Sequence, residues 1–170
     1  YVYRFRVSGA TSWTYCDTDG TDNGFSTDKM GALSVASVTV DWCNTQFPES
    51  IDATTGDTTT VYGQAYVAGC TDGGNDCSPL TAQLGVAPDG SDPTADASAY
   101  TWLDTTRNTG FSGASNDEFQ ADLSASNTGT FVYTYRMSGD GGQSWTYCDK
   151  DGTDNGFQAA QQGTMTVSSP

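Results

Sequence analysis

The sequence contains no histidine and few basic residues. Six lysines and arginines stand against 21 aspartates and glutamates, so the net charge is -15. Without histidine, Ser-His-Asp and Cys-His catalysis are excluded within this chain. A carboxylate pair remains the one option for acid–base catalysis, and no pair is indicated by its position, so no enzymatic activity is expected. The excess of negative charge argues against a nucleic-acid partner and against an anionic membrane surface.

Long apolar runs and helical periodicity are also scarce. No run is long enough for a membrane span, and no signal peptide is recognisable. Short alternating runs rich in Val, Thr, Tyr and Phe are instead separated by Gly, Asp, Asn, Ser and Pro. The pattern predicts an all-β fold, an antiparallel Ig-like β-sandwich. The predicted strands are 1–7, 12–16, 32–35, 38–42, 58–67, 80–86, 100–103, 118–123, 131–138, 143–148 and 164–167.

One stretch of the sequence occurs twice. Residues 13–25 read Trp-Thr-Tyr-Cys-Asp-Thr-Asp-Gly-Thr-Asp-Asn-Gly-Phe and return at 145–157 with a single change, from Thr18 to Lys150. Upstream, 1–9 aligns with 131–139 at an offset of 130, and a two-residue insertion then brings the offset to 132. The repeat indicates a tandem organisation and sets the module boundaries.

The repeat predicts one complete module over 39–170. Residues 1–38 then correspond to the carboxy-terminal hairpin and closing strand of a preceding or swapped module. Two explanations stay open for this segment. The chain is an excised part of a longer array, or its first strands complete a sheet of another chain by β-augmentation.

Five cysteines in a chain rich in Thr, Ser, Gly and Asp favour disulfides in an oxidising compartment over a metal site, with buried free thiols as the alternative. The simplest pairing is Cys70 with Cys77 and Cys43 with Cys148. The second bond closes a long loop and would contribute about 4–5 kcal/mol in the chain-entropy model. Cys16 is left over, and its natural partner is the equivalent of Cys43 in a preceding module. A rival pairing of Cys16 with Cys43 would leave Cys148 without a partner.

Each copy of the repeat contains an acidic loop. Carboxylate and amide oxygens at alternating positions, with glycines between them, suit a hard cation, so Ca²⁺ is a candidate ligand. The alternative is a long hairpin turn in which Asp and Asn hydrogen-bond to their own backbone. The candidate metal ligands are Asp17, Asp19, Asp22 and Asn23 in the first loop and Asp149, Asp151, Asp154 and Asn155 in the second.

Aromatic residues offer a possible ligand surface. Trp13 and Trp145 occupy equivalent positions next to cysteines, and packing within the hairpin explains them better than a sugar platform. Trp102, with Tyr100 beside it, lies between two predicted loops and is the best candidate for an exposed stacking residue. A carbohydrate-binding face would need several such rings on one side of the module.

Several segments resemble a known module type. They are Ala-Gln-Leu-Gly-Val-Ala-Pro-Asp-Gly-Ser-Asp-Pro at 82–93, Tyr-Thr-Trp at 100–102, Asn-Asp-Glu-Phe at 116–119, Phe-Val-Tyr-Thr-Tyr-Arg at 131–136, and the repeated Trp-Thr-Tyr-Cys-Asp. Together they resemble an Ig-like β-sandwich repeat module of large secreted bacterial surface proteins. The resemblance covers most of 39–170 and the partial unit before it. It implies an extracellular structural or accessory role and carries over no catalytic residues.

The expected function is therefore that of a structural or adhesive module, secreted or at the cell surface. Such modules would build an array or fibre by strand exchange with other copies of the protein or with neighbouring modules. The alternative is a carbohydrate-binding accessory module with a polysaccharide partner. Neither nucleic-acid binding nor membrane insertion is expected.

Overall fold

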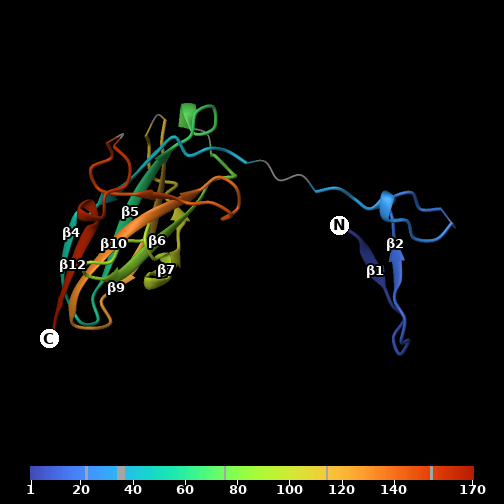
Figure 1. The fold of residues 1–170 in the computed structure, drawn as a ribbon, viewed down its shortest axis with the longest axis horizontal. Coiled ribbons are helices and arrows are strands. Elements are labelled where there is room, and N and C mark those ends of the chain that lie inside the picture. Colours follow the sequence, from blue (N-terminus) through green and yellow to red (C-terminus); the bar gives the residue numbers. More distant parts are fainter. Residues whose placement is uncertain (22, 34–36, 75, 114, 154) are drawn as a thin grey trace. The chain divides into compact units, whose positions relative to one another are not determined.

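The computed structural model describes all residues except 22, 34–36, 75, 114 and 154. The chain divides into two compact units, Tyr1–Val35 and Ala36–Pro170, which we call the small unit and the large unit. Both consist of strands and three-residue 3-10 helices (Figure 1). Over the described residues, none of these helices has the length or apolar character needed to cross a membrane. The prediction of an all-β fold is confirmed.

The large unit contains two sheets packed on each other. One sheet has the order β4-β12-β10-β6-β7, with β11 also paired to β10, and the other has the order β3-β5-β9-β8 (Figure 1). The strands are β3 Trp42–Phe47, β4 Ser50–Thr54, β5 Thr58–Tyr66, β6 Thr81–Pro88, β7 Thr101–Asp104, β8 Thr106–Arg107, β9 Asp117–Ser124, β10 Gly129–Ser138, β11 Thr146–Cys148 and β12 Gly163–Ser168. Short 3-10 helices lie between them, namely η2 Asp72–Gly74, η3 Ala97–Ala99 and η4 Ala159–Gln161.

Most strand pairs are antiparallel, as predicted, but β4 runs parallel to β12. The chain changes sheets between β7, which ends at Asp104 beside β6, and β8, which starts at Thr106 beside β9. Because both sheets present their alternate residues to the same interior, this architecture is a β-sandwich.

The core is formed around strand β10. Tyr133, Tyr135 and Met137 alternate along it and are fully buried. The Tyr135 ring lies so close to Gly63 of the facing sheet that a Cβ at Gly63 would come within 2.5 Å of the ring. The Tyr135 hydroxyl donates to the Val61 carbonyl at 2.7 Å. Glycine in β5 therefore provides the space that a large aromatic residue needs between the sheets.

Two disulfides are present, with the pairing expected from the sequence. Cys43 of β3 bonds to Cys148 of β11 and so ties one sheet to the other. Cys70 bonds to Cys77 and closes a short loop. Cys16 carries a free thiol, and the rival pairing of Cys16 with Cys43 is not found.

The small unit contains one hairpin of β1 Tyr3–Phe5 and β2 Thr14–Cys16, followed by the 3-10 helix η1 Thr27–Lys29 (Figure 1). The predicted strand 32–35 lies partly outside the described residues. Val38 belongs to the large unit, where its N–H donates to the Gly139 carbonyl at 2.8 Å.

The ladder registers correct the expected alignment of the two copies. Tyr3 pairs with Cys16 in the small unit, and Tyr135 pairs with Cys148 in the large unit. Equivalent residues are therefore 132 positions apart on β1 as well as on β2. The offset of 130 and the two-residue insertion were wrong.

Candidate functional site

In its described residues, the hairpin, loop and η1 of the small unit are a structural copy of residues 133–161 of the large unit. We call residues 133–167, which correspond in sequence to 1–35, the terminal segment. The same backbone hydrogen bonds close both loops. Thr18 N–H donates to the Lys29 carbonyl at 2.8 Å, and Lys150 N–H donates to the Gln161 carbonyl at 2.9 Å. Each loop ends in a one-turn 3-10 helix, η1 in one copy and η4 in the other. The local sequence therefore folds the same way in two different surroundings.

Acidic side chains hold both loops in shape. The Asp149 carboxylate accepts from the Gln158 N–H at 2.8 Å, and the Asp17 carboxylate accepts from the Ser26 N–H at 3.1 Å. A second bond follows in each loop, from Thr153 N–H to Asp151 at 2.9 Å and from Thr21 N–H to Asp19 at 3.0 Å. These are the contacts that a hairpin turn stabilised by its own aspartates would make.

The pKa of Asp149 and the pKa of Asp151 are shifted in opposite directions. Burial raises the pKa of Asp149, and the neighbouring charge of Asp151 raises it further. Hydrogen bonds from Thr153 lower the pKa of Asp151. The neighbouring Asn155 side chain also lowers the pKa of Asp151, as the Asn23 side chain lowers that of Asp19.

The described residues contain no group of three or more potential metal ligands. Two of the candidate ligands, Asp22 and Asp154, lie outside the described residues. Calcium binding by these loops stays a prediction.

The two copies differ most in the exposure of the apolar side chains on their first strand. Tyr1, Tyr3 and Phe5 of the small unit are 65%, 69% and 64% exposed, whereas the equivalent Tyr133, Tyr135 and Met137 are fully buried. In the large unit, this face of β10 lies against the second sheet. Among the described residues of the small unit, the two-stranded sheet of β1 and β2 is the only sheet, and the same apolar face is not covered by another one.

A second difference lies at the acidic loop. In the large unit, Trp42 of β3 packs on the loop, and its indole N–H donates to the Gly152 carbonyl at 2.6 Å. The adjacent Cys43 forms the disulfide with Cys148. The small unit has an open hollow of about 660 Å³ at the equivalent place, lined by residues between Trp13 and Phe25 that include Cys16 and Gly20. We call this hollow the socket.

An arginine packs on a tryptophan in both copies. The Arg136 guanidinium lies 3.8 Å from the centre of the Trp102 ring and 4.1 Å from that of Trp145. In the small unit, the Arg4 guanidinium lies 4.2 Å from the centre of the Trp13 ring. A guanidinium over an aromatic ring is attracted by the ring electrons. The large unit adds a second tryptophan from β7 to this contact.

The two predicted stacking residues occupy different environments. Tyr100 is only 6% exposed, and its hydroxyl donates to the Gln162 side chain at 2.6 Å, so its ring is not a free platform. Burial raises the pKa of Tyr100 to about 12. Trp102 is partly exposed, but its ring is stacked on Tyr100 and covered by Arg136. The prediction of an exposed stacking pair is therefore wrong for Tyr100.

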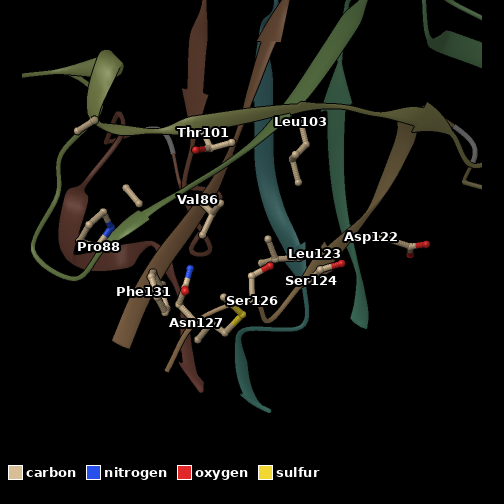
Figure 2. A pocket seen from close by; sticks show the side chains of 13 residues that line it. Val86, Pro88, Thr101, Leu103, Asp122, Leu123, Ser124, Ser126, Asn127 and Phe131 are labelled. Carbon is tan, nitrogen blue, oxygen red and sulfur yellow. The ribbon is translucent and has the colours of Figure 1, made fainter. Parts of the chain in front are cut away.

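A hollow of about 390 Å³ opens into the sandwich near the change of sheets (Figure 2). Leu103, Leu123, Phe131 and Met165 line it. Its one carboxylate, on Asp122, accepts a hydrogen bond from the Thr60 hydroxyl at 2.7 Å. Thr101, Ser124, Ser126 and Asn127 also line the hollow (Figure 2), and among its lining residues Asp122 is the only acid or base.

No protein-family model matches this sequence, and comparison with curated proteins finds no significant match.

Proposed function

We propose that the protein is an extracellular structural module that joins neighbouring modules by sheet complementation. The single observation that supports this function is the exposure of Tyr1, Tyr3 and Phe5, on a hairpin whose copy forms the centre of a sandwich core. The exposed hairpin then completes a sandwich that lacks its own terminal segment. Repetition of this contact would produce an array or fibre.

The energetics of the hairpin favour such a contact. An isolated two-stranded hairpin is marginally stable in water. Burial of a large apolar side chain stabilises by about 1.5–3 kcal/mol, and the small unit offers three exposed aromatic side chains at alternate positions, Tyr1 just before β1 and Tyr3 and Phe5 in it. Covering this face therefore provides the stability that the hairpin alone lacks.

An extracellular location suits this role. Both disulfides of the large unit form and persist in an oxidising compartment. Many copies of a strongly acidic chain stay soluble at high local concentration because like charges repel. The resemblance to repeat modules of secreted bacterial surface proteins agrees with this location.

A complementation experiment tests the function. The recipient is the full chain with Tyr135→Asp and Cys148→Ser, which weaken its own terminal segment by a buried charge and by loss of the disulfide. It also carries Tyr3→Asp and Cys16→Ser, so that its own small unit cannot take the place of that segment. The donor is the full chain with Cys16→Ser, so that no new disulfide contributes. We expect a one-to-one complex by native mass spectrometry after co-refolding, because Tyr3 of the donor replaces Tyr135 of the recipient.

Two further donors serve as controls. Tyr3→Asp in the donor should abolish the complex, because it places a charge in the core that the donor is to complete. Phe47→Ser removes an exposed aromatic residue of the large unit and should leave the complex intact. If the recipient binds none of the donors, or binds the Tyr3→Asp donor equally well, the proposed function is wrong.

Carbohydrate binding stays an alternative prediction. The remaining candidate for a stacking residue is the partly exposed Trp102. Its ring already packs against the Tyr100 ring and the Arg136 guanidinium. Affinity electrophoresis against a panel of glycans would detect it as retarded migration.

A further inference from the structure

We propose that the socket of the small unit binds a tryptophan–cysteine pair on a β3-like strand of a neighbouring module, and that Cys16 forms a disulfide with that cysteine. The inference rests on the proposed function, since it names the partner of the exposed hairpin. It goes further by specifying which strand of that partner binds, and through which two side chains.

The large unit shows the bound arrangement in detail. The indole N–H of Trp42 donates to the Gly152 carbonyl, and a Cβ at Gly152 would lie 3.0 Å from the Trp42 ring. Next along β3, Cys43 bonds to Cys148. Thr45 then donates its hydroxyl to the Cys148 carbonyl at 2.7 Å and its N–H to the Asp149 carbonyl at 2.8 Å. Three closely spaced residues of β3 thus attach to the terminal segment.

The small unit contains the equivalents of the three residues of the terminal segment that β3 contacts. Gly20 corresponds to Gly152, Cys16 to Cys148 and Asp17 to Asp149. Nothing lies within 4 Å of a Cβ built at Gly20. The socket measures about 660 Å³, against about 300 Å³ for the corresponding hollow beside Trp42 in the large unit. Cys16 carries the free thiol.

The partner is best described as a module whose terminal segment is missing or displaced. In an intact second copy of this chain, Trp42 and Cys43 already bind that copy's own terminal segment. Exchange would need the Cys16 thiolate to attack the Cys43 sulfur, which breaks the bond to Cys148 and releases Cys148 as a thiolate. Such an exchange replaces one disulfide and one set of hydrogen bonds with equivalent ones, so it has little driving force. A sandwich with an unoccupied β3 edge forms the same bonds and gives up none.

The same partner would cover the arginine of the small unit. Arg136 is held between Trp145 and Trp102, and Trp102 comes from β7 of the sandwich. In the small unit, Arg4 and also Arg6 lie over the Trp13 ring, at 4.2 and 4.7 Å from its centre. A neighbouring module would supply the equivalent of Trp102 and complete the stack.

The covalent step is an ordinary oxidation of two thiols. The Cys16 thiol and the partner thiol lose two protons and two electrons and form one sulfur–sulfur bond. A low-molecular-weight disulfide such as oxidised glutathione accepts them and is reduced to two thiols. Binding of the partner's tryptophan in the socket places the adjacent cysteine thiol next to Cys16, so this thiol reacts in preference to others.

The test uses the full chain and a synthetic peptide of residues 38–47, Val-Thr-Val-Asp-Trp-Cys-Asn-Thr-Gln-Phe. Both are equilibrated in a glutathione redox buffer that leaves the buried Cys43–Cys148 disulfide intact, and the Cys16 adduct is quantified by peptide mapping. We expect at least about tenfold more adduct than with the peptide carrying Trp42→Ala, because an aromatic contact and a hydrogen bond are lost.

A matched acceptor variant checks the geometry. Gly20 has a φ of +63°, a conformation that asparagine tolerates, so Gly20→Asn keeps the turn while its side chain enters the socket. We expect this variant to lose the preference for the tryptophan peptide and Cys16→Ser to form no adduct. Equal adduct from both peptides on the unchanged chain, or a Cys16–Cys16 dimer in place of the adduct, would overturn the proposal.

The two proposals fail separately. Complementation by the Cys16→Ser donor without any peptide preference would leave the proposed function standing and reject the tryptophan–cysteine contact. Peptide preference without complementation would support the socket and reject assembly through the hairpin face.

Discussion

The small unit and the terminal segment share a fold but differ in burial. Both have the same hairpin register, the same aspartate-stabilised loop and the same arginine–tryptophan contact. Tyr3 is nevertheless 69% exposed while Tyr135 is fully buried. The comparison shows that short-range hydrogen bonds are sufficient to shape this segment, whereas its apolar face needs strands from elsewhere in the chain or from a partner.

The comparison also locates the stabilising contributions that the small unit lacks. The terminal segment is fixed by the disulfide to Cys43, the hydrogen bond from Trp42 and the hydroxyl of Tyr135 on Val61. Each of these contacts joins the terminal segment to a strand of the second sheet, β3 or β5. Substitutions that remove these contacts should therefore lower the free energy of unfolding of the large unit strongly. The equivalent substitutions in the small unit should change stability little.

The largest difference is expected for the cysteines. Removing the Cys43–Cys148 disulfide by Cys43→Ala and Cys148→Ala should lower the free energy of unfolding by about 4 kcal/mol, since a loop of 105 residues is no longer closed. Cys16→Ala should leave it nearly unchanged. Guanidinium unfolding followed by tryptophan fluorescence measures both. A comparable loss from Cys16→Ala would mean that the small unit is already fixed to another part of the protein.

The next difference is expected at two equivalent glycines. A Cβ at Gly163 would lie 2.1 Å from the Tyr133 ring, and one at Gly31 would lie 2.4 Å from the Tyr1 ring. Gly163→Ala should destabilise the large unit by about 1–3 kcal/mol, because the buried ring has nowhere to move. Gly31→Ala should cost little, because the exposed ring turns into solvent. Thermal unfolding of both variants tests this, and equal losses would contradict an uncovered small unit.

A smaller difference is expected for two tyrosine hydroxyls. Tyr135→Phe removes the hydrogen bond to Val61 and should cost about 1 kcal/mol at neutral pH. Tyr3→Phe should have almost no effect.

Burial, reinforced by the charge of Glu118, raises the pKa of Tyr135 above its ordinary value of 10.0. The unfolded chain therefore releases this proton first, and the stability it contributes is complete below pH 10 and is lost as the pH rises further. Unfolding curves between neutral pH and pH 11 should show the wild type losing its advantage over Tyr135→Phe. A constant difference over that range would contradict the assignment.

The smallest effect concerns the acidic loops. If they bind calcium as predicted, a chelator should lower the unfolding midpoint by about 2–4 °C, and Asp149→Asn should remove that response. The Asp17→Asn variant tests the other copy. If the chelator does not change the unfolding midpoint, both loops are turns that are stabilised by their own hydrogen bonds and not by calcium.

Much of the fold was predictable from local patterns. The alternation in 58–67 and 131–138 corresponds to β5 and β10, and cysteine spacing indicated both disulfides. Strands β3 and β4 were missed or misplaced. Trp42–Phe47 contains Asn, Thr and Gln at positions that interrupt the apolar alternation, and the predicted strand 38–42 ends where β3 begins.

The register of the repeat shows a limit of pattern reading. A shift of two residues keeps every side chain on the same face of a strand, so apolar alternation cannot distinguish an offset of 130 from one of 132. The pairing of Tyr3 with Cys16 and of Tyr135 with Cys148 resolves it. The burial of Tyr100 was unpredictable for a related reason, because its partner Gln162 is distant in the sequence.

The amino-acid order alone predicts most of the β-strands, the repeated loop and the simplest cysteine pairing. These depend on short-range hydrogen bonding, on apolar alternation and on the positions of the cysteines in the repeat. Folding in three dimensions accounts for which copy of the hairpin is covered and for the socket that remains open beside Cys16. Burial depends on strands contributed from distant positions, so two segments that share the loop motif of 13–25 and 145–157 differ in burial in this structure.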